Sequence, residues 1–155
     1  SGQFLVVCGI GGGVPYSMNH DGTIRREAAV IDKDLESAMM AVQLGIPEFY
    51  ISTAVDYVKL DFGKSTERNI LSMSLRDLNR ILEEDAIKQK KEKQFAEGAM
   101  EPKLQAVQYF LQHSTSKDAK AYIANVNNLY EAIVNSQNCS VFGKHVETVV
   151  SAAKK

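Results

Sequence analysis

The chain has 155 residues, of which 45% are hydrophobic and 24% charged, and its formal net charge is -1 at pH 7. This length suits one domain with its own core, and so small a charge creates no field that would attract nucleic acid or an anionic membrane. No apolar run is long enough to span a bilayer, and no charged segment followed by a cleavage site marks a secretory signal. We therefore expect one cytoplasmic domain over residues 1–155, with neither nucleic acid nor membrane as a partner.

Cysteines and histidines give no sign of a metal or disulfide framework. Cys8 and Cys139 lack CxxC spacing, so both are expected to be free thiols. The histidines lie far apart without the spacing of a zinc site, and we predict surface positions for His20, His113 and His145.

The first third of the chain predicts a strand, a hairpin, a helix and a second strand. The apolar run 3–8 leads into a glycine-rich turn, and Asp21-Gly22 is a hairpin signal. Asp32 suits the N-cap of a helix that Gly45 ends, and its apolar face is formed by Leu35, Ala38, Met39 and Val42. The strand 47–53 follows. Such a strand–helix–strand unit predicts a parallel sheet with a right-handed crossover.

Helices and strands continue to alternate after residue 54, so the predicted class is α/β. An extended segment over 55–63 precedes a helix that begins with the capping-box pattern Ser74–Asp77. Further elements are a helix with Pro102 in its first turn, a strand over 121–126, a helix from Asn128 and a last strand over 147–152.

Glycines cluster in "GIGGGVP", directly after the first predicted strand. Gly9 and Gly11 to Gly13 allow the backbone to approach a ligand and offer several N–H groups to an anion. The pattern is no dinucleotide fingerprint, because Val14 stands where that motif needs glycine. A tight turn that requires positive φ angles is the alternative reading.

Lys33 lies at the first position of a predicted helix, in the sequence "VIDKD". A helix N-terminus is already partly positive, so a lysine there is favourable when an anion such as phosphate binds between the two. Asp32 and Asp34 would then hold the ammonium group or help to bind Mg²⁺. A solvent-exposed ion pair is the equally simple alternative.

The sequence "GAMEPK" repeats this arrangement. Gly98 permits an unusual turn, Pro102 begins a helix, and Lys103 lies in its first turn. Two lysines at two helix N-termini, together with a glycine loop, predict a site for a polyphosphate. Phosphoryl transfer needs little from a protein beyond positioned positive charge and a metal.

The chain resembles the carbamate kinases of the amino-acid kinase family. The resemblance rests on "GGGVP", "EAAVIDKDLESAMMAVQLG", "STAVD" and "QFAEGAMEPKLQAVQYFL", which occur in the family's order over most of residues 4–150. It implies a three-layer α/β/α sandwich with a mostly parallel sheet, and it covers only the C-terminal, nucleotide-binding half of the family's length. It also implies either a homodimer or pairing with the missing N-terminal half.

The resemblance further implies phosphoryl transfer between carbamoyl phosphate and MgADP, which gives ATP and carbamate, within arginine metabolism. Lys33 would stabilise the transferring phosphoryl group and Asp32 would organise that lysine. The nucleotide would contact Lys103, Met100, Gly98 and Asp56, and the substrate end would be lined by Gly11, Gly12 and Gly13. No protein-bound metal is implied besides the Mg²⁺ of ATP or ADP.

Ala99 and Glu101 depart from the family's pattern in the lysine loop, and Glu147 stands where glycine is usual. Glu101 adds negative charge beside a predicted phosphate site. Two other functions therefore stay open: a non-catalytic regulatory or scaffold relative that keeps the fold, and a kinase of another small acid. The loop "GAMEPK" favours the carbamate branch over the latter.

Overall fold

The computed structural model describes residues 14–88, 95 and 100–152. The predicted strand 3–8, Cys8, Gly9, the glycines 11–13 and Gly98 lie outside the described residues. None of the helices within these ranges is long and apolar enough to cross a membrane.

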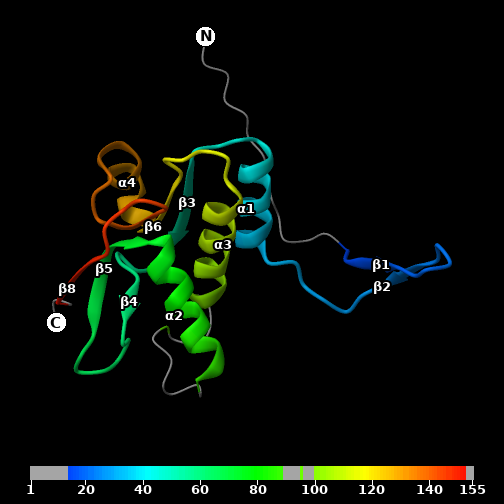
Figure 1. Cartoon of the computed structure of the whole chain (residues 1–155), viewed down its shortest axis with the longest axis horizontal. Helices are drawn as coiled ribbons and strands as arrows, with labels where there is room; N and C mark the ends of the chain where they lie inside the picture. The colour runs from blue at the N-terminus through cyan, green and yellow to red at the C-terminus, as the bar shows by residue number, and fades with distance from the viewer. Residues whose placement is uncertain (1–13, 89–94, 96–99, 153–155) are drawn as a thin grey trace, which may run out of the picture.

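A β-hairpin precedes the main body and stands apart from it (Figure 1). Strands β1 (Tyr16–Met18) and β2 (Ile24–Arg26) are antiparallel, and Gly22 in the turn has φ of +82°. The Asp21 carboxylate accepts the Thr23 N–H at 2.9 Å. The predicted hairpin is thereby confirmed.

The body contains a mixed sheet of six strands. These are β3 (Glu48–Thr53), β4 (Lys59–Leu60), β5 (Arg68–Ser74), β6 (Lys120–Asn125), β7 (Cys139–Gly143) and β8 (Val149–Ala152). Their order is β3-β6-β7-β5-β4, and β8 also pairs with β5. The predicted parallel pairing is present between β3 and β6 and between β5 and β7, but the two pairs run in opposite directions because β6 and β7 are antiparallel. Strands β4 and β8 are antiparallel to β5.

Helices cover both faces of this sheet. The larger helices are α1 (Lys33–Gln43), α2 (Leu75–Ile87) and α3 (Met100–His113). Along β6, Ile123 packs into the main core with these helices, whereas Tyr122 on the other face packs with Ala132. Ala132 belongs to α4 (Leu129–Asn135), which follows the 3-10 turn η2 (Val126–Asn128). The predicted α/β class and its three layers are therefore confirmed (Figure 1).

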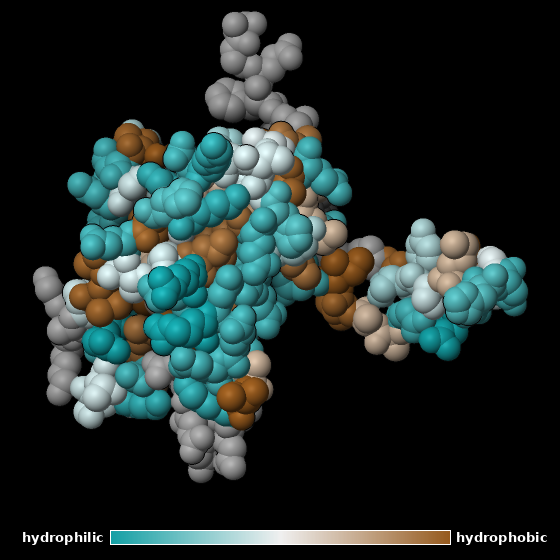
Figure 2. Space-filling model, in the orientation of Figure 1, coloured by the Kyte–Doolittle hydropathy of each residue, from teal (hydrophilic) through white to brown (hydrophobic). Residues whose placement is uncertain are grey.

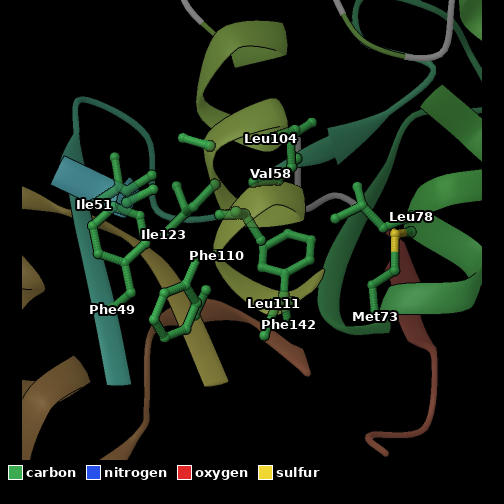
Figure 3. Close-up of a cluster of buried hydrophobic side chains, with 14 of the residues drawn as sticks. Phe49, Ile51, Val58, Met73, Leu78, Leu104, Phe110, Leu111, Ile123 and Phe142 are labelled. Carbon is green, nitrogen blue, oxygen red and sulfur yellow. The ribbon is translucent and has the colours of Figure 1, made fainter. Parts of the chain in front are cut away.

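The main core lies between the sheet and α3, and it fixes the position of that helix (Figure 3). Phe110 of α3 packs against Phe49 of β3 with ring centroids 5.3 Å apart. Leu104, Leu111 and Ile123 are fully buried beside them. Burial of each such side chain stabilises the fold by about 1.5–3 kcal/mol.

Both helices that carry a predicted site lysine pack antiparallel to the strand that follows them. A Schellman motif ends α1, in which Gly45 has φ of +65° and Ile46 donates to the Ala41 carbonyl. After this turn the chain reverses its direction and enters β3. The chain likewise reverses its direction after α3 and enters β6. The N-termini of α1 and α3 consequently lie at the edge where β3 and β6 end, which is the usual ligand edge of an open α/β sheet.

Candidate functional site

A charged cluster joins the first turns of α1 and α3. Lys103 Nζ of α3 lies 2.6 Å from Asp34 Oδ2 of α1, and the two side chains are only 10% and 13% exposed. Lys33 Nζ lies 3.8 Å from the same oxygen. One carboxylate is therefore placed between two ammonium groups, and the cluster of these three side chains carries a net positive charge.

Asp32 is the N-cap of α1, as its position in the sequence predicted. Its Oδ1 atom accepts the N–H groups of Asp34 and Leu35, both at 2.9 Å, and so caps α1. The carboxylate that pairs with Lys33 is that of Asp34. Asp32 thus fixes the first turn of the helix, while Asp34 contacts both lysines.

Lys33 is the accessible cation of this cluster. Its side chain is 64% exposed, and it borders a cavity of about 440 Å³ together with Val30, Ile31 and Asp32. Val30 is 88% exposed, and Figure 2 shows apolar atoms where the linker from the hairpin reaches the body. An anion in this cavity would meet both the lysine and the N-terminus of α1.

A second cavity of about 540 Å³ opens at the same edge, where β3 and β6 end. It is lined by Ala54, Val55, Asp56, Tyr57, Lys59, Asn69, Leu71, Asn125, Asn138 and Ser151. Asp56 Oδ1 accepts from Asn128 Nδ2 at 3.1 Å, and Asn125 Nδ2 donates to the Ala54 carbonyl at 3.1 Å. These bonds hold the segment after β3 against the end of β6.

Lys59 is fixed in the wall of this second cavity. Its ammonium donates to Glu67 Oε1 at 2.7 Å, and Glu67 Oε2 accepts the Gly63 N–H at 2.8 Å. These bonds, chiefly the one from Lys59, lower the pKa of Glu67. Glu67 is therefore a carboxylate at neutral pH, and the lysine has a local counter-charge.

The structure groups the predicted site residues into two places. Lys33, Asp32 and Lys103 lie together at the helix N-termini, and Met100 at the start of α3 packs against the main core. Asp56 lines the second cavity, whose wall includes none of those four residues.

The described residues contain no group of three or more His, Cys, Asp or Glu that could hold a metal ion. Of the two aspartates near Lys33, one caps α1 and the other pairs with Lys103. His20, His113 and His145 are exposed, as expected, and Cys139 is a buried free thiol whose pKa burial raises.

Sequence reasoning missed most of the second cavity. Lys59, Asn69, Asn138 and Ser151 come from segments that are separated by up to about ninety residues along the chain, and no local motif links them. Strands β5 and β7, which were not predicted, bring these segments together.

Comparison with known proteins identifies relatives by sequence and by structure, although no family model matches. Carbamate kinase of Staphylococcus haemolyticus is 30% identical over 129 residues, which are 83% of this chain and 38% of the relative. A carbamate kinase-like protein of Mycoplasma pneumoniae is 33% identical over the same shares. The solved structure of carbamate kinase from Giardia lamblia bound to AMP-PNP matches 86% of this chain and 42% of its own, with TM-score 0.69 and 28% identity.

The resemblance predicted from the sequence motifs is thus confirmed by both kinds of comparison. The chain spans about two fifths of the length of the relatives that it matches. Over that part of their length, the chain is similar in sequence and in fold to the carbamate kinases.

Proposed function

We propose that this chain forms the nucleotide-binding part of a carbamate kinase. The observation that carries the proposal is the cluster of Lys33, Asp34 and Lys103, which places two ammonium groups at two neighbouring helix N-termini. Helix N-termini and lysines both favour phosphate. The phosphates of ADP or ATP would bind here, and the adenosine would occupy the cavity beside Asp56 at the same sheet edge.

In the proposed reaction, an oxygen of the terminal phosphate of ADP attacks the phosphorus of carbamoyl phosphate. The bond from phosphorus to the carbamate oxygen breaks, and carbamate leaves with that electron pair while ATP forms. Negative charge spreads over the moving phosphoryl oxygens, so positioned positive charge lowers the barrier. Lys33, exposed beside its cavity, supplies that charge.

Asp34 would act as a positioning residue in this scheme. Its carboxylate fixes the Lys103 ammonium at 2.6 Å, so that this nearly buried lysine meets the nucleotide phosphates in one orientation. Asp32 contributes by capping α1, which holds the first turn and its N–H groups in place. Mg²⁺ enters as part of the nucleotide substrate, with its own waters and phosphate oxygens as ligands.

The proposal assigns the carbamate end to Gly11, Gly12 and Gly13, and the nucleotide loop to Gly98, all outside the described residues. Since the relatives are longer than this chain, the complete active site would include residues beyond these 155. A homodimer or pairing with that further part would complete the assembly, and the proposed compartment is the cytoplasm.

A second candidate is a relative that binds nucleotide without catalysis. Glu101 in the first turn of α3 favours it, because a carboxylate two residues before Lys103 opposes the approach of phosphate. A kinase of another small acid would use the same nucleotide site with a different acceptor.

Phosphoryl transfer is tested by following ATP formation from MgADP and carbamoyl phosphate with a luminescent ATP assay. The chain is assayed alone and with any further part of its parent protein, beside Lys33→Met. The proposal expects ATP formation that Lys33→Met reduces by at least about 100-fold, in the range for loss of one charge-stabilising group. Nucleotide binding without turnover would favour the non-catalytic relative, and turnover only with acetyl phosphate would favour another small acid.

A further inference from the structure

Asn69 is an unusual residue in the wall of the 540 Å³ cavity. It lies on β5, directly opposite Lys59 of β4 and Ser151 of β8, and all three line the cavity. Its Oδ1 atom is buried and has no hydrogen-bond partner among the described residues, which is the one such case there. A buried acceptor without a donor is unfavourable, so turning this oxygen into the cavity toward a ligand that donates would relieve that cost.

Neighbouring polar groups of the cavity already have partners. Asp56 accepts from Asn128, Lys59 donates to Glu67, and Asn125 both donates to Ala54 and accepts from Asn127. These groups shape the wall. Asn69 differs from them because its acceptor is unused while its side chain remains half-buried at the cavity.

We propose that Asn69 selects adenine as the base of the nucleotide. Its carboxamide would accept from the exocyclic amino group of adenine and donate to the adjoining ring nitrogen. This inference rests on the proposed function, which places the base in this cavity. Rotation of the carboxamide about χ2, an angle with broadly distributed values in asparagine, directs Oδ1 into the cavity. The backbone of β5 holds the residue in place.

The chemistry of the bases explains the selectivity. An amide side chain pairs with adenine through one donor and one acceptor, which adenine presents side by side. The corresponding edge of guanine presents two acceptors and would leave Oδ1 unpaired. A carboxylate at this position accepts from the amino group of adenine but cannot donate to the ring nitrogen, and on guanine it would face two acceptors.

The test is calorimetric titration of the whole 155-residue chain with MgADP and MgGDP. The variants are Asn69→Leu, Asn69→Asp and Lys103→Ala, and Asn19→Leu in the exposed hairpin makes the same chemical change far from the cavity. Unmodified chain should bind MgADP more tightly than MgGDP. Asn69→Leu should weaken MgADP about 10-fold or more and leave MgGDP within about two-fold. Asn69→Asp should weaken MgADP, because a carboxylate cannot donate to the ring nitrogen, and it should not improve the affinity for MgGDP. Asn19→Leu should change neither affinity.

Each contrary result has a distinct meaning. If neither Asn69 variant changes the ratio of the affinities for MgADP and MgGDP, while Lys103→Ala weakens the binding of both nucleotides, the role of Asn69 is wrong and the nucleotide site stands. Equal affinity of the unmodified chain for both nucleotides also overturns the inference. If the folded chain binds neither nucleotide, the proposed function falls as well. Thermal unfolding of each variant checks the fold, and Asn69→Asp, which keeps the side-chain shape, decides the question if Asn69→Leu fails to fold.

Discussion

Lys103 and Asp34 are 69 residues apart in sequence, yet their Nζ and Oδ2 atoms lie 2.6 Å apart across the contact between α1 and α3. Both side chains are largely shielded from water. Shielding strengthens the attraction between the charges, and it makes the loss of one partner costly because the other charge is left buried. This ion pair therefore links the packing of the two helices to the position of the proposed phosphate site.

Asp34→Asn should destabilise the fold. Removing one charge of a largely buried pair leaves Lys103 without its counter-charge, and we expect a loss of about 3 kcal/mol in the free energy of unfolding. Urea denaturation followed by circular dichroism measures it. Glu84→Gln is the matched control: its carboxylate pairs with Arg80 and Lys88 on the surface, so its loss should be under about 1 kcal/mol. Equal losses in both variants would contradict the structural role of Asp34.

Asp32→Ala should destabilise α1 by about 1 kcal/mol, because two N–H groups of its first turn lose their acceptor. Asp32→Ser keeps an N-cap oxygen and should restore most of that stability. The same urea experiment measures both. If serine proves as destabilising as alanine, then Asp32 does more than cap the helix, and this would support the role as organiser of Lys33 that the family resemblance implied.

The hydrogen bonds of the Asp77 carboxylate should make the free energy of unfolding decrease in acid. This carboxylate accepts from Thr148 Oγ1 at 2.6 Å and from Ser74 Oγ at 3.0 Å, and these bonds, that of Thr148 first, lower the pKa of Asp77 below 3.8. Because the folded pKa is lowered, the stabilisation is present above the unfolded value and disappears as the pH falls through the folded value.

Thr148→Val should raise the pKa of Asp77 toward its ordinary value, which an NMR titration of the carboxyl carbon measures directly. Its effect on the urea midpoint should be greater at pH 6 than in acid, because the stabilisation from the carboxylate is lost as the pH falls through the folded pKa. Thr66→Val, in the exposed β4–β5 loop, is the control. An unchanged pKa in Thr148→Val would show that this hydrogen bond contributes nothing.

Phe110→Ala should cost about 3–5 kcal/mol, since its ring is fully buried against Phe49 and the deletion leaves a cavity beneath α3 (Figure 3). Phe62→Ala removes a ring that is 56% exposed and should cost much less. Thermal unfolding of both variants measures the difference, and similar midpoints would mean that α3 is not anchored by this core.

Local patterns predicted the parts of the fold that depend on neighbours in sequence. The hairpin at Asp21-Gly22, the cap at Asp32, the end of α1 at Gly45 and the first strand after it are all present. The capping box at Ser74 is only half formed: its hydroxyl accepts the Asp77 N–H, whereas its own N–H donates to Thr148 instead of to Asp77. Thr148 lies 74 residues away, which no local pattern reveals.

Long-range pairing explains the other differences. The reversal of direction between β6 and β7 arises from a short return through α4 to β7, whose sequence "CSVFG" has few strand signals. Likewise, the choice between Asp32 and Asp34 as partner of the lysines depends on where α3 packs. In the sequence "DKD" the aspartates on either side of Lys33 are equally good candidates. Only the contact between Asp34 and Lys103 in the folded chain distinguishes them.

Calorimetric titration of this chain with MgADP, beside Lys103→Ala, tests whether the α1–α3 cluster binds phosphate. We expect saturable binding by the unmodified chain and affinity at least about 10-fold weaker in the variant, since a charged contact to phosphate is lost. Circular dichroism confirms in parallel that both proteins are folded. Absence of saturable binding by the folded chain, or binding that Lys103→Ala leaves unchanged, would contradict the assignment of the α1–α3 cluster as a phosphate site.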